Sequence, residues 1–212
     1  AELAEQRALF EPLRQDGRPI VAVVAASGNA RKDWTPEGYA AVVDALEHEL
    51  GCRTLLVGGP GEREVSLARG IQERARAKPL WALGDGVRRV LWLIHGSDLL
   101  ISPDTGPLHM ARAMDVPVIG LFGHTNPWRV GPYRKYEDLW VDHYNEPGDP
   151  ADASRAEPKL GRMETITPRE VLERVQRAID AYGVGQGQGQ GRRQTAGTGV
   201  GAAAPCAEPG NG

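Results

Sequence analysis

Residues 98–123, DLLISPDTGPLHMARAMDVPVIGLFG, indicate the fold class most clearly. Its first run, 98–104, predicts a strand. Pro107 to Met114 has the composition of a helix, and Pro107 suits its first turn. The run VPVIGLFG at 116–123 predicts a second strand. A strand, a helix and a strand joined by short turns are typical of a parallel sheet.

The same alternation extends in both directions from this stretch. Further strands are expected at 20–27, 53–59, 80–83 and 138–143, because each is a short apolar run. Helical patterns separate them: one opened by Thr35-Pro36 and closed by Gly51, then 62–77, 87–95, and a last helix capped by Thr167. The chain is therefore predicted to be α/β, a Rossmann-like parallel sheet with helices on both faces.

Composition limits the classes of function. The 212 residues contain 25 Lys and Arg against 28 Asp and Glu, and the net charge of −3 argues against nucleic acid as a partner. Cys52 and Cys206 are too far apart to suggest a disulfide framework or a zinc site. No apolar run reaches the ~18 residues of a membrane span, and the first residues lack a signal peptide pattern, so a cytoplasmic location is expected.

Three segments are predicted along the chain. Residues 1–17 have helical composition and are assigned to a connecting helix or linker, and residues 18–182 to the Rossmann-like domain. The segment 183–212 is rich in Gly and Gln and contains no Leu, Ile, Phe or Trp. Such a segment cannot bury enough apolar surface to offset its ordering entropy, so it is predicted to be a disordered tail.

Polar residues gather where ligands of such sheets bind, in the loops beyond the carboxyl ends of the strands. In SPDTGPLHMA, Asp104 ends a strand, Thr105-Gly106 forms a tight turn, and His109 follows one turn into the helix. Free N–H groups and the helix dipole at this position favour an anion such as phosphate. The competing interpretation is a helix that Asp104 and Thr105 simply cap.

Two more loops carry candidate residues. In SGNARKDWTPEGYA, residues 27–40, the Ser27 hydroxyl and the Lys32 ammonium could hold phosphate oxygens. The alternative is a solvated turn with Trp34 packed on the sheet edge. In GGPGERE, residues 58–64, Glu62 could accept hydrogen bonds from two ribose hydroxyls, or simply place negative charge in a first helical turn.

A fourth loop, residues 120–133, offers His124 or Arg129 to a phosphate, although a structural loop explains it equally well. Several familiar signatures are absent from the sequence: the NTPase phosphate loop, the G-x-S-x-G nucleophile elbow, the G-x-G-x-x-G fingerprint after residue 57, and an Asp-x-Asp pair for a metal. The remaining histidines have no metal-ligand spacing: His48, His95 and His143.

SPDTGPLHMA followed by VPVIGLFGHTNPWRVGP resembles glycosyltransferase family 9, the bacterial lipopolysaccharide heptosyltransferases and their relatives. The D-T-G-x-x-H turn and the F-G-x-T-x-P-x-x-x-G-P loop occur in the family's order and spacing. Lys32, Trp34 and Pro36 match an upstream K-x-W-x-P element. The resemblance covers residues 18–182. His124 departs from it, because many members carry proline at that point.

The resemblance implies a GT-B architecture of two Rossmann-like domains, of which this chain corresponds to the C-terminal, donor-binding half. The acceptor site and the catalytic base would belong to the N-terminal half, so this chain alone is not expected to transfer sugar. Carried over by position, the donor-binding residues would be Ser27 and Lys32 at the diphosphate, Glu62 at the ribose, Asp104 at the sugar hydroxyls, Thr105 and Gly106 at the phosphates, and His109 nearby.

The function implied by this resemblance is inverting, metal-independent transfer of a sugar from a nucleotide-diphospho-sugar of the ADP-heptose type, in lipopolysaccharide or cell-surface glycan synthesis. The donor is a substrate, and no cofactor is expected. A glycolipid or oligosaccharide acceptor would bind through the other half, and peripheral contact with the inner membrane stays open. The alternative is a nucleotide-binding module without transfer activity, acting as a partner or regulatory domain. A nucleotide-sugar epimerase is disfavoured, because its expected histidine and carboxylate set is absent from these loops.

Overall fold

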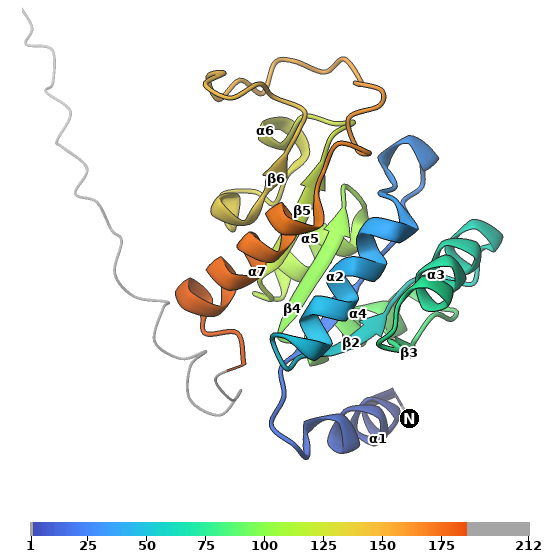
Figure 1. Cartoon of the computed structure of the whole chain (residues 1–212). Helices are drawn as coiled ribbons and strands as arrows, with labels where there is room; N and C mark the ends of the chain where they lie inside the picture. The colour runs from blue at the N-terminus through green and yellow to red at the C-terminus, as the bar shows by residue number, and fades with distance from the viewer. Residues whose placement is uncertain (1, 186–212) are drawn as a thin grey trace, which may run out of the picture.

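The computed structural model describes residues 2–185, which form a six-stranded sheet in the order β3-β2-β1-β4-β5-β6 (Figure 1). Every neighbouring pair of strands is parallel. The strands are β1 (Ile20–Val23), β2 (Arg53–Leu56), β3 (Leu80–Trp81), β4 (Leu99–Pro103), β5 (Val118–Phe122) and β6 (Val141–Asp142). The predicted Rossmann-like α/β class is therefore confirmed.

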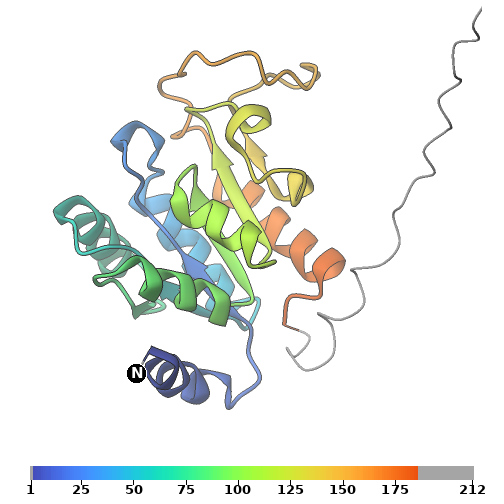
Figure 2. The ribbon, with the colours of Figure 1, turned by 180° about the vertical axis from the view of Figure 1, so that it is seen from behind.

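Helices cover both faces of this sheet, as Figures 1 and 2 show from opposite sides. On one face lie α2 (Pro36–His48), α3 (Glu62–Arg74) and α7 (Pro168–Tyr182), with α2 packed between the other two. On the other lie α4 (Val87–Gly96) and α5 (Gly106–Ala113). Three short elements complete the fold: η1 (Ala30–Lys32), α6 (Pro127–Val130) and η2 (Glu137–Leu139).

Burial on both faces explains the continuous apolar strands. Every residue of β1, β4 and β5 is buried. Such runs predict burial better than they predict pairing, and the predicted strands are longer than the observed ones. The clearest error is 138–143, where η2 precedes the two-residue β6. Leu139 faces the core there as part of a turn of 3-10 helix.

The predicted helix caps are confirmed. Thr35 accepts a hydrogen bond from Gly38 N at 3.1 Å, and Pro36 occupies the first turn of α2. At α7, Thr167 and Glu170 form a complete capping box. These local bonds satisfy amides that the helix itself leaves without partners.

The first helix, α1 (Glu2–Arg14), packs against α4. Phe10 is buried, and its ring lies so close to Gly96 that a Cβ there would be 2.4 Å away. The Gln6 side chain donates to Trp92 O at 2.9 Å. The segment has the predicted helical conformation, and its assignment as a connecting segment stays a prediction.

At the other end, Gly183 closes α7 in the left-handed region with φ 66°, and Val184 is buried. The rest of the predicted tail, residues 186–212, lies outside the described residues. Within residues 2–185, no helix has the length and apolar character needed to cross a membrane.

Candidate functional site

A cavity of about 460 Å³ opens beyond the carboxyl ends of β1, β2 and β4. Three of the candidate residues line it: Ser27, Glu62 and Thr105. β1 and β4 are neighbours from which the chain continues towards opposite edges of the sheet, so the cavity lies at the topological switch point. Its volume is within the range of small-molecule sites.

The start of α5 forms one side of this cavity. Thr105 is the N-cap residue, yet its side chain makes no cap hydrogen bond. Pro107 has no N–H, and Leu108 N donates to Thr105 O at 3.1 Å, so the Gly106 amide is the first-turn donor left for a ligand. The interpretation of Thr105 as a self-contained cap is therefore wrong.

Asp104 lies directly before this turn, with a side chain only 8% exposed. Lys32 Nζ donates to its Oδ2 at 2.7 Å, and Thr125 Oγ1 donates to the same oxygen at 2.9 Å. His109 Nε2 is 3.9 Å from Oδ1, on a side chain that is 51% exposed. Three loops thus converge on one carboxylate, and Oδ1 keeps the capacity to accept from a ligand hydroxyl. The Asp104 carboxylate is also engaged away from the α5 amides, so it is not a helix cap.

Lys32 reaches Asp104 because of the turn that precedes it. Asn29 Oδ1 accepts from Arg31 N at 3.1 Å and caps η1, the short helix that carries Lys32. The Ser27 hydroxyl donates to Asn29 O at 2.7 Å. Ser27 therefore uses its proton inside the turn, and only its remaining lone pairs and its position at the cavity wall are available to a ligand.

Asp33 and Arg63 belong to this site, and sequence reasoning missed both. Asp33 Oδ1 accepts from Ser27 N at 2.7 Å, and Arg63 Nη1 lies 3.2 Å from Asp33 Oδ2. Arg63 also donates to Ser27 O. Burial raises the pKa of Asp33, although the Ser27 N–H and the Arg63 charge oppose that shift. The adjacency of Arg63 to Glu62 in GGPGERE was the available signal.

Glu62 lies exposed at the rim of the cavity, in the first turn of α3. Its neighbour Glu64 turns inward and accepts from Gly59 N at 2.9 Å. The α3 N-cap is Gly61, which has no side chain to cap the helix. Glu62 is thus placed where both of its predicted uses, a ribose contact and favourable first-turn charge, are compatible with the structure.

The 120–133 loop contributes Thr125 to the site, and not the residues that sequence reasoning singled out. His124 is buried, and its Nδ1 lies 2.7 Å from Lys159 O, so the ring donates to a backbone carbonyl. Arg129 is exposed on α6. Thr125, the T of F-G-x-T, belongs to the site because the fold brings its hydroxyl to Asp104, a contact that no local sequence pattern indicates.

Trp34 has a structural role, as its competing interpretation holds. It is 2% exposed, and its Nε1 donates to Ile166 O at 3.0 Å, in the turn before α7. A Cβ on Gly38 would lie 2.3 Å from its ring, so α2 needs glycine at this position.

The other histidines lie away from the site. His48 Nδ1 contacts Asp44 O at 2.9 Å, and His143 lies between Thr165 and Glu170. Among residues 2–185, no three or more His, Cys, Asp or Glu side chains are grouped so that they could hold a metal ion. The positively charged side chains of the site include Lys32, paired with Asp104, and Arg63, paired with Asp33.

Residues 1–157 match the family described as "Glycosyltransferase family 9 (heptosyltransferase)". The lipopolysaccharide core heptosyltransferase OpsX of Haemophilus influenzae is 32% identical over 130 residues, which cover 61% of this chain and 37% of OpsX. The chain thus spans well under half the length of such curated relatives.

Solved structures share the fold. The structure of E. coli ADP-heptose lps heptosyltransferase II has a TM-score of 0.67 at 19% identity, covering 86% of this chain and 52% of that one. E. coli heptosyltransferase WaaC with ADP has a TM-score of 0.59 at 20% identity, covering 82% of this chain and 48% of that one. At these identities the likeness establishes the fold alone.

Proposed function

The chain belongs to glycosyltransferase family 9, and from this premise we propose that it binds a nucleotide-diphospho-sugar of the ADP-heptose type. It would act as the donor-binding part of a glycosyltransferase of lipopolysaccharide or cell-surface glycan synthesis. One observation carries the proposal: the cavity and the Lys32–Asp104 pair meet at the start of α5. Hydroxyl acceptors, cations and free amides lie together there, as a sugar diphosphate requires.

The proposed donor spans both parts of this site. Its diphosphate would lie against the α5 amides at Thr105 and Gly106, near Lys32 and the Ser27 turn. Glu62 at the cavity rim would bind the ribose, and His109 would border the phosphates from the next turn of α5. The transferred sugar would place a hydroxyl on Asp104 Oδ1, because Oδ2 already accepts from Lys32 and Thr125.

Lys32 lies where the bond would break. Transfer breaks the bond between the sugar carbon and the diphosphate oxygen, and negative charge grows on the departing diphosphate. The Lys32 ammonium, already beside the sugar-binding carboxylate, and the positive end of α5 would stabilise that charge. Thr125 would hold Asp104 in place while Lys32 turns partly towards phosphate. These groups support metal-independent transfer.

The site contains no group assigned to deprotonate an acceptor. Asp104 is committed to Lys32 and Thr125, and Glu62 lies at the cavity rim on α3. We therefore assign the catalytic base, the glycolipid or oligosaccharide acceptor and the inverting geometry to the pairing of this fold with an N-terminal half of the family. A nucleotide-binding module with no transfer would leave the same site intact, so transfer needs its own assay.

The donor site is tested by calorimetric titration of the chain with ADP and with ADP-heptose. Wild type should bind both, and Asp104→Asn should weaken ADP-heptose more than ADP, because only the sugar contacts Asp104. Asp115→Asn, which changes the carboxylate of a surface ion pair with Lys135, is the matched control. Equal losses for the two ligands would remove Asp104 from the sugar, and a wild type that binds neither would refute the donor site.

Transfer is tested by adding a family N-terminal half and an acceptor. A product detected by mass spectrometry, with the inverted anomer by NMR and no loss of rate in EDTA, is the expected result. Binding without any product would favour the nucleotide-binding module.

A further inference from the structure

Arg63 is the cationic side chain that lines the proposed donor cavity. The other charged residues of its wall, within the described chain, are the carboxylates Glu62 and Glu64. Lys32 is held 2.7 Å from Asp104 and does not line the cavity wall. On the cavity wall itself a diphosphate would therefore meet two carboxylates and one cation, Arg63, while Lys32 would reach it from its place beside Asp104. Without that cation the wall would repel the ligand that the proposed function requires.

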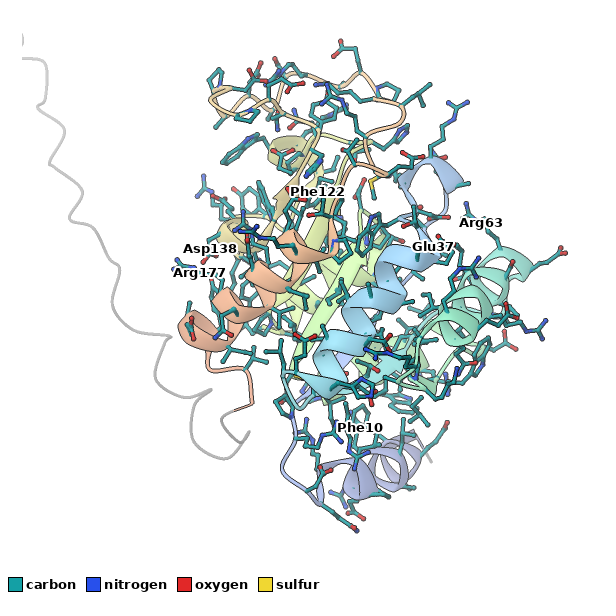
Figure 3. All side chains as sticks on the ribbon, in the orientation of Figure 1. Phe10, Glu37, Arg63, Phe122, Asp138 and Arg177 are labelled. Carbon is teal, nitrogen blue, oxygen red and sulfur yellow. The ribbon has the colours of Figure 1, made fainter. Side chains whose placement is uncertain are left out.

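Two contacts with the loop after β1 hold the Arg63 guanidinium in place. Arg63 Nη1 lies 3.2 Å from Asp33 Oδ2, and Nη2 donates to Ser27 O. Asp33 is itself fixed, since its side chain is 7% exposed and its Oδ1 accepts from Ser27 N at 2.7 Å. Figure 3 shows Arg63 between α3 and the loop that carries η1. The residue thus joins the loop after β1 to the helix after β2.

These contacts leave some of the N–H donors of the Arg63 guanidinium available to a ligand. A guanidinium has five N–H groups in a fixed plane, and the Asp33 and Ser27 contacts occupy its two Nη atoms without exhausting their hydrogens. The Arg63 side chain is 38% exposed while it lines the cavity. A planar donor group already held in one orientation loses little freedom when a phosphate arrives.

We propose that Arg63 binds the diphosphate of the donor, with Asp33 as the residue that positions its guanidinium. The proposal rests on the proposed function, and it adds a phosphate ligand supplied by α3, on the opposite side of the cavity from α5. The competing account makes Arg63 only a tie between two loops. The two accounts predict different effects of removing Arg63. A phosphate ligand affects the affinity for the diphosphate, whereas a tie between loops does not act on the diphosphate alone.

The test compares ADP with adenosine, because adenosine lacks the diphosphate. Each is titrated into wild type, Arg63→Gln, Arg63→Lys and Asp33→Asn in low salt. Arg69→Gln is the matched control, an exposed arginine two turns further along α3. Circular dichroism melting checks that each variant folds. If Arg63→Gln does not fold, Arg63→Lys still tests the role of the guanidinium.

Arg63→Gln should lose about tenfold to a hundredfold in ADP affinity, the range for a charge-assisted hydrogen bond, while adenosine affinity stays within about twofold. Arg63→Lys should recover part of the loss, Asp33→Asn should lose less than Arg63→Gln, and Arg69→Gln should match wild type.

Unchanged ADP affinity in a folded Arg63→Gln, or parallel losses for ADP and adenosine, would overturn the role of Arg63 and leave the donor site standing. A wild type that binds neither ligand would overturn the donor site and this inference together.

Discussion

The helices α5 and α7 begin with similar sequences and end up with different N-termini. Each has a threonine N-cap and an early proline, Thr105-Gly106-Pro107 in one and Thr167-Pro168 in the other. Thr167 forms a capping box with Glu170, whereas the Thr105 side chain makes no cap bond. At α7 the capping box satisfies first-turn donors, whereas at α5 no side chain caps the Gly106 amide, which lies between the cavity-lining residues Thr105 and Pro107.

This difference separates the helices that support the sheet from those that border the cavity. The N-terminus of α2 is capped as that of α7 is, with Thr35 bonded to Gly38 N at 3.1 Å. α3, like α5, borders the cavity, and its N-cap Gly61 makes no side-chain cap bond. The supporting helices α2 and α7 are capped by a threonine side chain, whereas the N-cap residues of α3 and α5, which border the cavity, make no side-chain cap bond.

The largest expected effect is on ligand affinity at the cavity. Lys32→Met keeps the aliphatic stem but removes the charge, and should weaken ADP by about 1.5–3 kcal/mol, measured by calorimetry. Lys135→Met is the control, because it removes a lysine that also pairs with an aspartate, Asp115 at 2.5 Å, outside the cavity. Equal ADP affinities in the two variants would contradict a phosphate role for Lys32.

A change at the N-cap of a supporting helix should alter the free energy of unfolding and leave ligand affinity unchanged. Thr167→Ala removes the hydroxyl that accepts from Glu170 N, although the backbone N–H of residue 167 can still donate to Glu170, and should lower the free energy of unfolding by about 1–2 kcal/mol, with ADP affinity unchanged. Urea denaturation of the variant and of Ser66→Ala, at an exposed position on α3, measures the difference. A loss of ADP affinity in Thr167→Ala would mean that the two regions are not separate.

Thr105→Ala breaks the comparison most directly. Because the Thr105 side chain makes no cap bond, this variant should change the free energy of unfolding by less than about 0.5 kcal/mol. The same urea titration applies. A destabilisation as large as that of Thr167→Ala would show that the α5 N-terminus is capped after all.

The smallest effect is a pH dependence at α7. Burial raises the pKa of Glu170, but hydrogen bonds from Thr167 and the nearby His143 lower it more, so this pKa lies below its ordinary value of 4.5. A lowered pKa contributes stability above pH 4.5 that is lost as pH falls through the folded-state pKa. Glu170→Gln should therefore lose less stability than wild type between about pH 5 and pH 3. Parallel melting curves against pH would contradict the role of the carboxylate, whose exposure makes the effect modest.

Local patterns predicted the elements well and their extents poorly. The order of strands and helices, and the caps at Thr35 and Thr167, follow from periodicity and from side chains that bond within their own turn. The strand predicted at 138–143 exists only at Val141–Asp142, because an apolar run reports burial, which η2 achieves through Leu139 without pairing to a neighbouring strand. The resemblance to the family came from spacing within loops, which is also local.

Local patterns were enough to predict the α/β class and the loops after β1, β2 and β4 that border the cavity. Which side chains of those loops meet depends on the three-dimensional fold. Lys32 and Asp104 are 72 residues apart and Thr125 is 21 beyond Asp104, yet all three share one carboxylate oxygen. Asp33 likewise holds Arg63 from another loop. Such contacts depend on strand order, which places β1 beside β4 and β4 beside β5, and no local pattern encodes that order.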